Sequence, residues 1–338
     1  MKKKYIFLAL LVAVAGVEIF LRITRYQQLK VHAYPMIYAP DSLTKYRYVP
    51  NAAGYISKPS IEKKFVINSE GYTGPEFSPS KPDGKYRIIV AGNSNAGGIW
   101  LHGHESYPIV LQSLYKKTDP NVEVVACAID GFNRNWEMIK LIKHKLVNYS
   151  PDLIVLESNF PLDFDNRTRE CYKNYVLEYS LDSPETKQGC IRKVENLEAW
   201  WPLTLLYDLS YSVRLVCKYY IDETPEHSDG ALLGYIRMYR EKSVKSPMLY
   251  YRFTDARGIA EMDTLNQMLR ARNTKLVMLS YREPILNAEL KRIGVPSITL
   301  RLPETKALSH AHDGHFNPRA HRLIAERLHE NLNAFITP

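Results

Sequence analysis

Short apolar runs alternate with amphipathic stretches over two parts of the chain, about residues 85–157 and 260–335. The runs are apolar at nearly every position, which is typical of strands buried on both faces, whereas the stretches between them repeat apolar residues every three or four positions, as helices do. The strand candidates are 86–91, 122–128, 152–157, 275–280 and 297–300, and the helix candidates are 107–117, 136–147, 260–272, 284–293 and 318–335. The alternation predicts an α/β fold with three α/β/α layers around a flavodoxin-like, doubly wound parallel sheet of about five strands.

The first 25 residues carry a different pattern. Lys2, Lys3 and Lys4 precede a run over residues 5–21 that is apolar except for Glu18. A basic start followed by an apolar stretch is typical of a membrane anchor or an export signal, and the lysines favour a cytoplasmic N-terminus. We expect a single-pass anchor in the cell membrane, with the remaining chain on the periplasmic or extracellular side. Two alternatives stay open, which are cleavage at the small residues 13–16 and a buried helix of a cytosolic protein.

The strand–helix alternation lapses between about residues 160 and 260. We expect an anchor segment (1–25), a lead-in segment packed on the main domain (26–84) and a main domain (85–338) with a mainly helical insertion at about 160–260, which is not a separate domain. Within the insertion, the spacing predicts a helix near 203–219. Trp200 and Trp201 precede that helix and could stack on sugar rings, although aromatic residues in insertions more often serve packing.

Composition and charge exclude some classes of protein and of binding partner. With 45% apolar and 24% charged residues, the chain has the composition of an ordinary globular protein, which excludes the fibrous and disordered classes. The formal charge of +9 falls to +5 when the five basic residues and Glu18 of residues 1–25 are set aside, and the remaining excess is dispersed. We therefore expect no nucleic-acid partner.

The four cysteines are too few for a disulfide scaffold. Cys171 and Cys190 flank a polar segment, so a disulfide between them in an oxidising compartment is one interpretation and two unpaired thiols the other. Cys127 lies in an apolar run and Cys217 in a predicted helix, so both are expected to be buried thiols.

Polar and small residues gather where the predicted strands end. The segment 92–95 follows the first strand, 130–133 the second and 158–159 the third, while 310–317 precedes the last helix. In an open parallel sheet, ligands bind beyond the carboxyl ends of the strands. These four segments are therefore the candidates for a functional site.

Within these segments, a serine, a histidine and an aspartate have the chemistry of an acyl-transfer site. Ser94 follows a strand at a strand-to-helix turn, where a serine is held exposed as a nucleophile. His315, preceded by Asp313, could supply a base and the carboxylate that orients it. Each segment alone has a plainer interpretation, because Gly-Asn-Ser and Asp-Gly are common turns and Asp313 could cap the last helix. Their combination favours catalysis.

The chain resembles the SGNH/GDSL-type serine hydrolases, in the branch that carries an N-terminal membrane segment. The resemblance is carried by residues 68–72, 85–98, 122–132, 151–166 and 313–325. It implies that Ser94 is the nucleophile, that the backbone N–H groups of Ser94 and Gly131 form part of the oxyanion hole, that His315 is the base and that Asp313 orients it.

The sequence departs from the family pattern at three places. Asn93 replaces the usual aspartate before the serine, and a single residue separates Asp313 from His315 where the family has two. By spacing, the usual oxyanion asparagine falls on Leu162, so Asn159 is the candidate replacement. Losing one oxyanion donor typically costs about 2.7–4 kcal/mol of transition-state stabilisation.

The expected function is that of an extracytoplasmic serine esterase or O-acyltransferase that acts on an O-acylated glycan or a lipid ester through a Ser-His-Asp acyl-enzyme. The candidate substrate-binding residues are Asn93, Asn95, Trp200 and Trp201, and no cofactor is expected. One alternative is a catalytically inactive, glycan-binding descendant of the family. Another is a metal-dependent hydrolase that uses His310, His312, Asp313 and His315, because imidazoles with a carboxylate suit zinc.

Overall fold

The computed structural model describes residues 2–24, 37–58, 61–98, 100–131, 135–158, 167–173, 175–180, 183–220, 231–241, 243–245, 256–281, 287–303, 306–310 and 313–336. The chain forms two compact units. Unit 1 holds residues 1–36, 55–62 and 167–248, and unit 2 holds residues 37–54, 63–166 and 249–338. The domain boundaries expected from the sequence stay a prediction.

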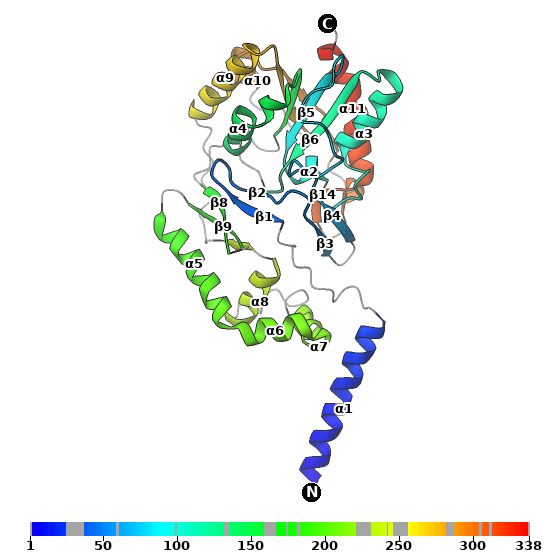
Figure 1. Ribbon diagram of the computed structural model, residues 1–338, viewed down its shortest axis with the longest axis vertical. Helices are drawn as coiled ribbons and strands as arrows, with labels where there is room; N and C mark the ends of the chain where they lie inside the picture. The colour runs from blue at the N-terminus through cyan, green and yellow to red at the C-terminus, as the bar shows by residue number, and fades with distance from the viewer. Residues whose placement is uncertain are drawn as a thin grey trace. The chain divides into compact units, whose positions relative to one another are not determined.

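Unit 2 is built on a parallel sheet of five strands (Figure 1). The strands are β5 (Tyr86–Gly92), β6 (Val122–Ala128), β7 (Leu153–Glu157), β11 (Lys275–Ser280) and β12 (Ser297–Thr299). Their order across the sheet is β12-β11-β7-β5-β6, and all neighbours pair in parallel. The first strand of the sheet, β5, is therefore an inner strand. The next strand, β6, pairs on one side of it, and β7, β11 and β12 follow in turn on the other side. This order confirms the flavodoxin-like, doubly wound sheet predicted from the sequence.

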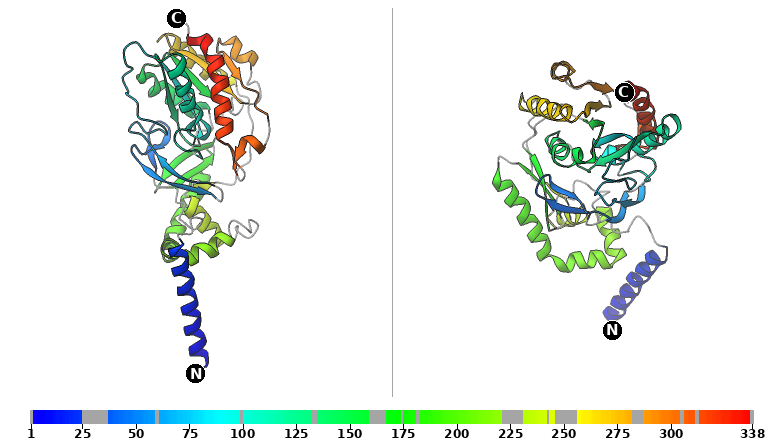
Figure 2. Two further views of the ribbon diagram at one scale, coloured as in Figure 1. Left: turned by 90° about the vertical axis from the view of Figure 1, so that its right-hand side faces the viewer. Right: turned by 45° about the horizontal axis from the view of Figure 1, so that its top comes forward.

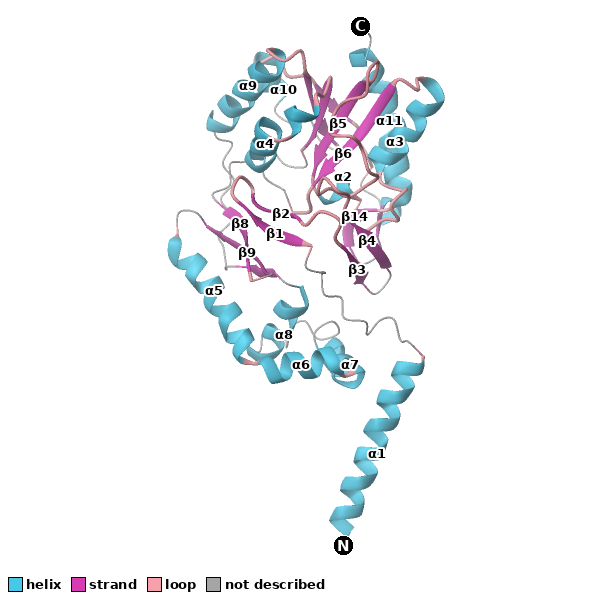
Figure 3. Ribbon diagram, viewed as in Figure 1, coloured by secondary structure: helices cyan, strands magenta, loops and turns pink. Residues whose placement is uncertain are grey.

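Helices cover both faces of this sheet, so its strands are buried on both sides (Figure 3). One face is covered by α3 (Tyr107–Thr118) and α11 (Pro318–Ile336), and the other by α4 (Asn135–His144), α9 (Ala256–Arg270) and α10 (Asn287–Arg292). All five residues of β7 are buried. The continuous apolar runs are thus the cause of the three-layer architecture, because only a doubly covered sheet removes such strands from water.

Two two-stranded sheets precede the central sheet. In the first, β1 (Tyr38–Asp41) pairs antiparallel with β2 (Lys45–Tyr48), and in the second β3 (Ala53–Lys58) pairs with β4 (Ile61–Val66). Tyr46 and Tyr48 point inward and are almost fully buried. A short two-stranded sheet of β13 (Ser309–His310) and β14 (Asp313–Phe316) comes directly before α11.

Unit 1 contains most of the expected insertion and the N-terminal helix α1 (Lys2–Ile23). Its other helices are α5 (Pro184–Ala199), α6 (Trp201–Leu209), α7 (Tyr211–Lys218) and α8 (Ala231–Glu241). A three-stranded sheet in the order β10-β9-β8 accompanies them, formed by β8 (Arg167–Tyr172), β9 (Tyr175–Ser180) and β10 (Ser243–Lys245). Helix dominates the insertion as predicted, but the sequence analysis missed this sheet.

The helix predicted near 203–219 is divided in two at Ser210. The backbone of Ser210 is extended, with φ −115° and ψ 121°, and its hydroxyl accepts a hydrogen bond from Val213 N. A serine side chain that caps a helix in this way starts a new helix rather than continuing the old one. The prediction of a single helix here was wrong for that reason.

Of the two interpretations of Cys171 and Cys190, the disulfide is not formed. Both residues are buried thiols. Cys171 lies on β8, whereas Cys190 lies on α5, where its Sγ is 3.7 Å from the carbonyl oxygen of Glu178 on β9. The Cys190 thiol is therefore directed at the strand backbone and not at Cys171. Cys127 and Cys217 are buried thiols, as expected.

Candidate active site

Ser94 lies at the carboxyl end of β5, where the strand turns directly into the short helix α2 (Ser94–Gly97). Asn93 caps this helix, because its Oδ1 accepts from Asn95 N at 3.1 Å. The turn is too tight for a side chain at Gly92, where a Cβ would lie 2.5 Å from Glu157 Oε2 and 2.6 Å from Ala96 Cβ. Glycine before the capping residue therefore allows the turn that presents Ser94.

His315 comes from β14, which packs against α2, so its ring lies beside Ser94 although the two residues are far apart in sequence. The distance from Ser94 Oγ to His315 Nε2 is 2.8 Å, across 221 residues of sequence. Asn317 holds the segment in place, since its Nδ2 donates to the carbonyl oxygens of Ala307 and Ser309 and its Oδ1 caps α11 through Ala320 N. The helix cap considered for Asp313 is therefore supplied by Asn317.

The second ring nitrogen of His315 is bound by an indole. Trp100 Nε1 donates to His315 Nδ1 at 3.0 Å, and the two rings meet edge to face with centroids 5.9 Å apart. An indole N–H can only donate, so Nδ1 is the acceptor and the proton of the neutral imidazole is on Nε2. In this arrangement Nε2–H donates to the Ser94 hydroxyl oxygen. Trp100 was not among the predicted site residues, and its one signal in the sequence is that it follows the Ser94 turn by six residues.

A buried carboxylate lies under the Ser94 turn. Glu157, the last residue of β7, is 4% exposed, and Tyr107 Oη donates to its Oε2 at 3.2 Å. The ring of Tyr281 packs edge to face on Tyr107. Burial, together with the Glu157 charge, raises the pKa of both phenols well above 10, so both stay protonated. Glu157 was predicted to end a strand, but it was not among the predicted site residues.

Two further ionisable groups lie close to the site. His321 on α11 accepts from Tyr107 N through Nδ1 at 3.1 Å, and burial, with His310 and Lys63 nearby, lowers its pKa to about 3. Lys63 on β4 donates from Nζ to Gly98 O at 3.3 Å, and burial lowers its pKa to about 8. His321 is therefore neutral at physiological pH.

The turn that carries Gly131 lies beside the end of β5, because Ile129 N donates to Gly92 O at 3.1 Å. Gly131 has a φ of +77°, which glycine adopts without strain. Tyrosines of the β1–β2 hairpin hold the turn at Asp130. Tyr46 Oη donates to its carbonyl oxygen, Tyr48 Oη accepts from its N–H, and Tyr38 Oη donates to its carboxylate. The lead-in hairpin thus positions one of the candidate oxyanion donors.

The remaining predicted site residues are placed as follows. Asn159 and His312 lie outside the described residues, and of Asp313 the structure describes the backbone, which pairs with His310. Asn95 has a buried Oδ1 that meets no hydrogen-bond partner among the described residues. Trp200 and Trp201 belong to unit 1, where both side chains are at least half exposed.

The metal-site alternative rests on His310, His312, Asp313 and His315, of which His312 and the Asp313 side chain lie outside the described residues. Within the part of the chain that the structure describes, no three His, Cys, Asp or Glu side chains gather so that they could hold a metal ion. His315 is one of the ligands in that alternative. In the structure its Nε2 is hydrogen-bonded to Ser94 Oγ and its Nδ1 to Trp100 Nε1.

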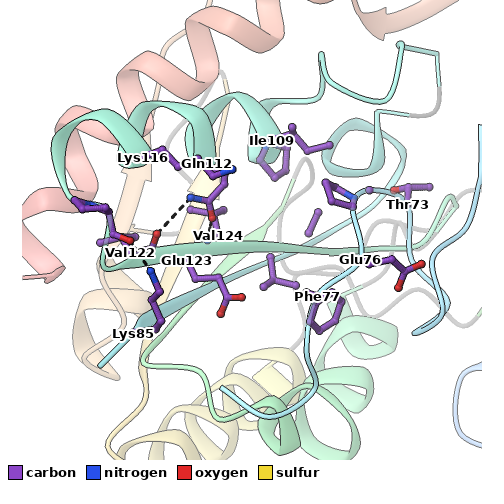
Figure 4. Close-up of a pocket in the computed structure, with 16 residues that line it drawn as sticks. Thr73, Glu76, Phe77, Lys85, Ile109, Gln112, Lys116, Val122, Glu123 and Val124 are labelled. Carbon is purple, nitrogen blue, oxygen red and sulfur yellow. Dashed lines mark hydrogen bonds between the residues drawn. The ribbon is translucent and has the colours of Figure 1, made fainter. Parts of the chain in front are cut away.

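A cavity of about 310 Å³ lies along β6, the edge strand of the sheet, and includes neither Ser94 nor His315 (Figure 4). Gln112 reaches into it from α3, donating to Val122 O and accepting from Val124 N. The side chain thereby satisfies backbone groups at the open edge of the sheet, where they would otherwise be available for pairing with another strand.

No protein-family profile and no curated protein matches the sequence. Solved structures do match. TesA matches with 11% identity and a TM-score of 0.42, over 74% of this chain and 99% of its own. The psychrotrophic esterase EstA from Pseudoalteromonas sp. matches with 11% identity and a TM-score of 0.41, over 75% and 99%. A GDSL-like lipase from Bacteroides thetaiotaomicron matches with 9% identity and a TM-score of 0.36, over 76% and 92%. At this identity the matches concern the fold, and the chemistry rests on the chain's own residues.

Proposed function

We propose that this chain is a membrane-anchored SGNH/GDSL-type serine esterase or O-acyltransferase. The observation that supports the proposal most strongly is the 2.8 Å distance between Ser94 Oγ and His315 Nε2 at the carboxyl end of β5. A hydroxyl and an imidazole within hydrogen-bond reach, at the edge where parallel sheets bind ligands, are the nucleophile and base of an acyl-transfer site.

In the proposed reaction, His315 takes the proton of Ser94 as the serine oxygen attacks the ester carbonyl. The backbone N–H groups of Ser94 and Gly131, with the amide of Asn159 as the expected third donor, hold the negative charge of the tetrahedral intermediate. His315 then protonates the departing alkoxide, which leaves an acyl group on Ser94. Water or a sugar hydroxyl, deprotonated by His315, releases that acyl group in the second half-reaction.

The hydrogen bond from Trp100 Nε1 to His315 Nδ1 must break before His315 can act as the base. The base needs an unprotonated Nε2, and in a neutral imidazole this requires the proton on Nδ1, the atom that accepts from Trp100. We infer that the indole withdraws from Nδ1 when substrate binds and that the ring then takes its other tautomer, with the proton moved from Nε2 to Nδ1. Asp313, two residues before His315 on β14, would accept the hydrogen bond from this Nδ1–H and stay ionised. Trp100 is on this proposal a positioning residue that keeps the resting site in the unreactive tautomer.

The proposed location is the outer side of the cell membrane, with α1 as the anchor. Residues Lys4–Ile23 of α1 are long and apolar enough to cross a bilayer. Glu18 within this helix bonds to residues of unit 1, and a signal peptide removed from the mature protein would not require such contacts. Acyl groups on a glycan or on a lipid are the ester substrates that an enzyme at this location would meet.

The decisive experiment compares turnover of a chromogenic acetyl ester by the full-length protein and its variants in detergent. We expect Ser94→Ala and His315→Ala to abolish turnover, because each removes one partner of the 2.8 Å pair. Neither should lower the free energy of unfolding by more than about 1 kcal/mol, as for polar positions outside the apolar core. Ser113→Ala and His329→Gln, which change the same residue types on α3 and α11, should leave turnover unchanged.

A fluorophosphonate probe distinguishes the alternatives. Labelling of Ser94 that persists with a chelator supports the serine mechanism over a metal-dependent hydrolase. Equal turnover by the wild type, Ser94→Ala and His315→Ala would end the esterase proposal, and the glycan-binding alternative would then take its place.

A further inference from the structure

Exposed apolar side chains gather on α6, α7 and the residues that flank them. Outside α1, nine of the eleven large apolar side chains that are exposed in the described chain lie within residues 200–220. Six of these are 50–63% exposed and are here called the α6–α7 patch: Trp200, Trp201, Leu206, Leu209, Val216 and Tyr219. Surfaces that face only water rarely concentrate large apolar residues in this way, so the patch indicates an apolar partner.

The α6–α7 patch is not needed to complete the hydrophobic core of unit 1. The opposite sides of the same helices are already packed, since Tyr207 of α6 and Cys217 of α7 are buried in one cluster with Ile236 of α8. α6 is thus apolar on an inner face that is filled and on an outer face that is not, and α7 adds the exposed side chains of Leu215 and Val216. Helices that are apolar all round are typical of protein interiors or of membranes.

Helix α1 is bonded directly to the start of α7. The carboxylate of Glu18 accepts hydrogen bonds from the backbone N–H of Tyr211 and Ser212, at 3.0 and 2.8 Å, and from the hydroxyls of Ser210 and Ser212, both at 2.9 Å. Arg22 forms an ion pair with Glu18 at 2.8 Å and lies over the ring of Tyr211. These bonds fix α7 to the C-terminal end of the apolar helix.

The position of Glu18 along α1 determines at what depth in a bilayer the α6–α7 patch would lie. Glu18 is five residues before Ile23, where α1 ends, which corresponds to roughly 8 Å along the helix. In Figure 1 and in the left-hand view of Figure 2, α6 and α7 lie near the C-terminal end of α1 and not along its length. If α1 crosses a bilayer, the two helices lie at the boundary between the acyl chains and the headgroups.

We propose that the α6–α7 patch is seated in the interfacial layer of the bilayer that α1 spans. The inference rests on the proposed anchoring by α1 but does not depend on the esterase activity. Two tryptophans and a tyrosine suit this depth, where aromatic side chains are enriched. Within residues 200–220 the charged side chains are Asp208, Arg214 and Lys218. A segment with so little net charge binds by burying apolar area and not by attraction to anionic headgroups.

The test uses tryptophan fluorescence of the full-length protein in phosphatidylcholine vesicles that contain lipids brominated in the acyl chains. The chain has four tryptophans, two of which belong to the patch. We expect bromolipid to quench about half of the fluorescence, and Trp200→Phe/Trp201→Phe to remove most of the quenchable part. Raising the salt concentration should leave the quenching unchanged.

Two outcomes contradict the inference in distinguishable ways. Protein that floats with the vesicles but is not quenched by bromolipid would show that α1 anchors the chain while the patch faces water, a glycan or a second copy. Protein that does not float with the vesicles would overturn the anchoring itself, and the seating of the patch with it.

A second set of variants keeps the test independent of the tryptophans. Leu206→Glu and Val216→Glu place a charge in the patch and should reduce the quenching of Trp200 and Trp201 about twofold or more. Leu232→Glu changes an exposed leucine of α8 outside the patch and should not alter it. Equal quenching in all three variants would contradict the proposed seating.

Discussion

The His315 ring connects the elements of the site at the scale of single residues. Its Nε2 is 2.8 Å from Ser94 Oγ and its Nδ1 is 3.0 Å from the Trp100 indole nitrogen. Because the indole N–H can only donate, the ring cannot hold a proton on Nδ1 while this bond lasts. The reactivity of Ser94 should therefore depend on a residue that does not touch it.

Replacing the indole by a phenyl ring tests this dependence. Trp100→Phe keeps an aromatic ring against His315 but removes the N–H donor. We expect fluorophosphonate to label Ser94 roughly fivefold faster, the factor that corresponds to a net hydrogen bond of about 1 kcal/mol. The nitrogen-15 chemical shifts of His315 should move toward the form protonated on Nδ1, a change that a purely structural effect would not produce.

The matched control for this variant is Trp200→Phe, which makes the same substitution at an exposed position of unit 1. It should leave both the labelling rate and the His315 shifts unchanged. Slower labelling by Trp100→Phe at unchanged stability would instead mean that the indole assists the reaction.

The sequence predicted some of these residues and could not predict others. Ser94 and His315 stood out because each is a reactive side chain beside a predicted strand end or final helix, and the fold brings such positions together. Trp100 did not stand out, because an aromatic residue after a turn is usually packing. Lys63 lies on a strand with alternating burial, where a lysine is expected to face water, and its burial depends on contacts with residues distant in sequence.

At the scale of elements, the β5–α2 turn is the part of the site that tolerates the least change. A Cβ at Gly92 would lie 2.5 Å from Glu157 Oε2 and 2.9 Å from Glu157 Cβ. Both atoms belong to a buried side chain at the end of β7 and cannot move away freely. The turn therefore depends on the absence of a side chain at this position.

We expect Gly92→Ala to lower the free energy of unfolding by about 1–3 kcal/mol, the usual result of overpacking a dense core. The rate of ester turnover should fall further than the loss of stability alone explains, because the displaced turn moves Ser94. Chemical denaturation and turnover, measured on the same preparation, check both effects. Gly103→Ala, where a Cβ meets no described atom within 4 Å, should change neither quantity.

Element boundaries were predicted well where burial alone decides them. The five strands of the central sheet begin and end within a residue or two of the expected positions. Four of them, β5, β6, β7 and β11, are largely apolar and buried, and β12 is a short strand in which Ile298 is the buried residue. The β8–β9 hairpin was missed because Arg167, Arg169 and Glu170 give its first strand the appearance of a polar loop. The break at Ser210 was missed because the apolar spacing continues across it, and only the serine cap divides the helix.

For the molecule as a whole, His321 makes the stability of unit 2 sensitive to acid. Its pKa falls from 6.5 in water to about 3, because the ring is buried on Tyr107 with His310 and Lys63 nearby. Below pH 6.5 the His321 ring of the unfolded chain binds a proton, whereas in the folded chain the same ring stays neutral until the pH falls to about 3. Stability is therefore lost as the pH falls through this window, by about 3 kcal/mol at pH 4.5.

His321→Asn should remove this contribution. An asparagine Oδ1 can accept from Tyr107 N in place of the ring nitrogen, so the variant should lose only about 1–2 kcal/mol of packing at pH 7.5. Between pH 7.5 and 4.5, its free energy of unfolding should then decline less steeply than that of the wild type. Denaturation of the full-length protein at several pH values gives both slopes, and His329→Asn on the same helix should follow the wild-type slope.

The long sequence separation between Ser94 and His315 also has a consequence for biosynthesis. The serine emerges from the ribosome more than two hundred residues before its partner. On the proposed function, a nascent chain would therefore carry an inert hydroxyl at Ser94 until β14, which holds His315, has formed beside the end of β5.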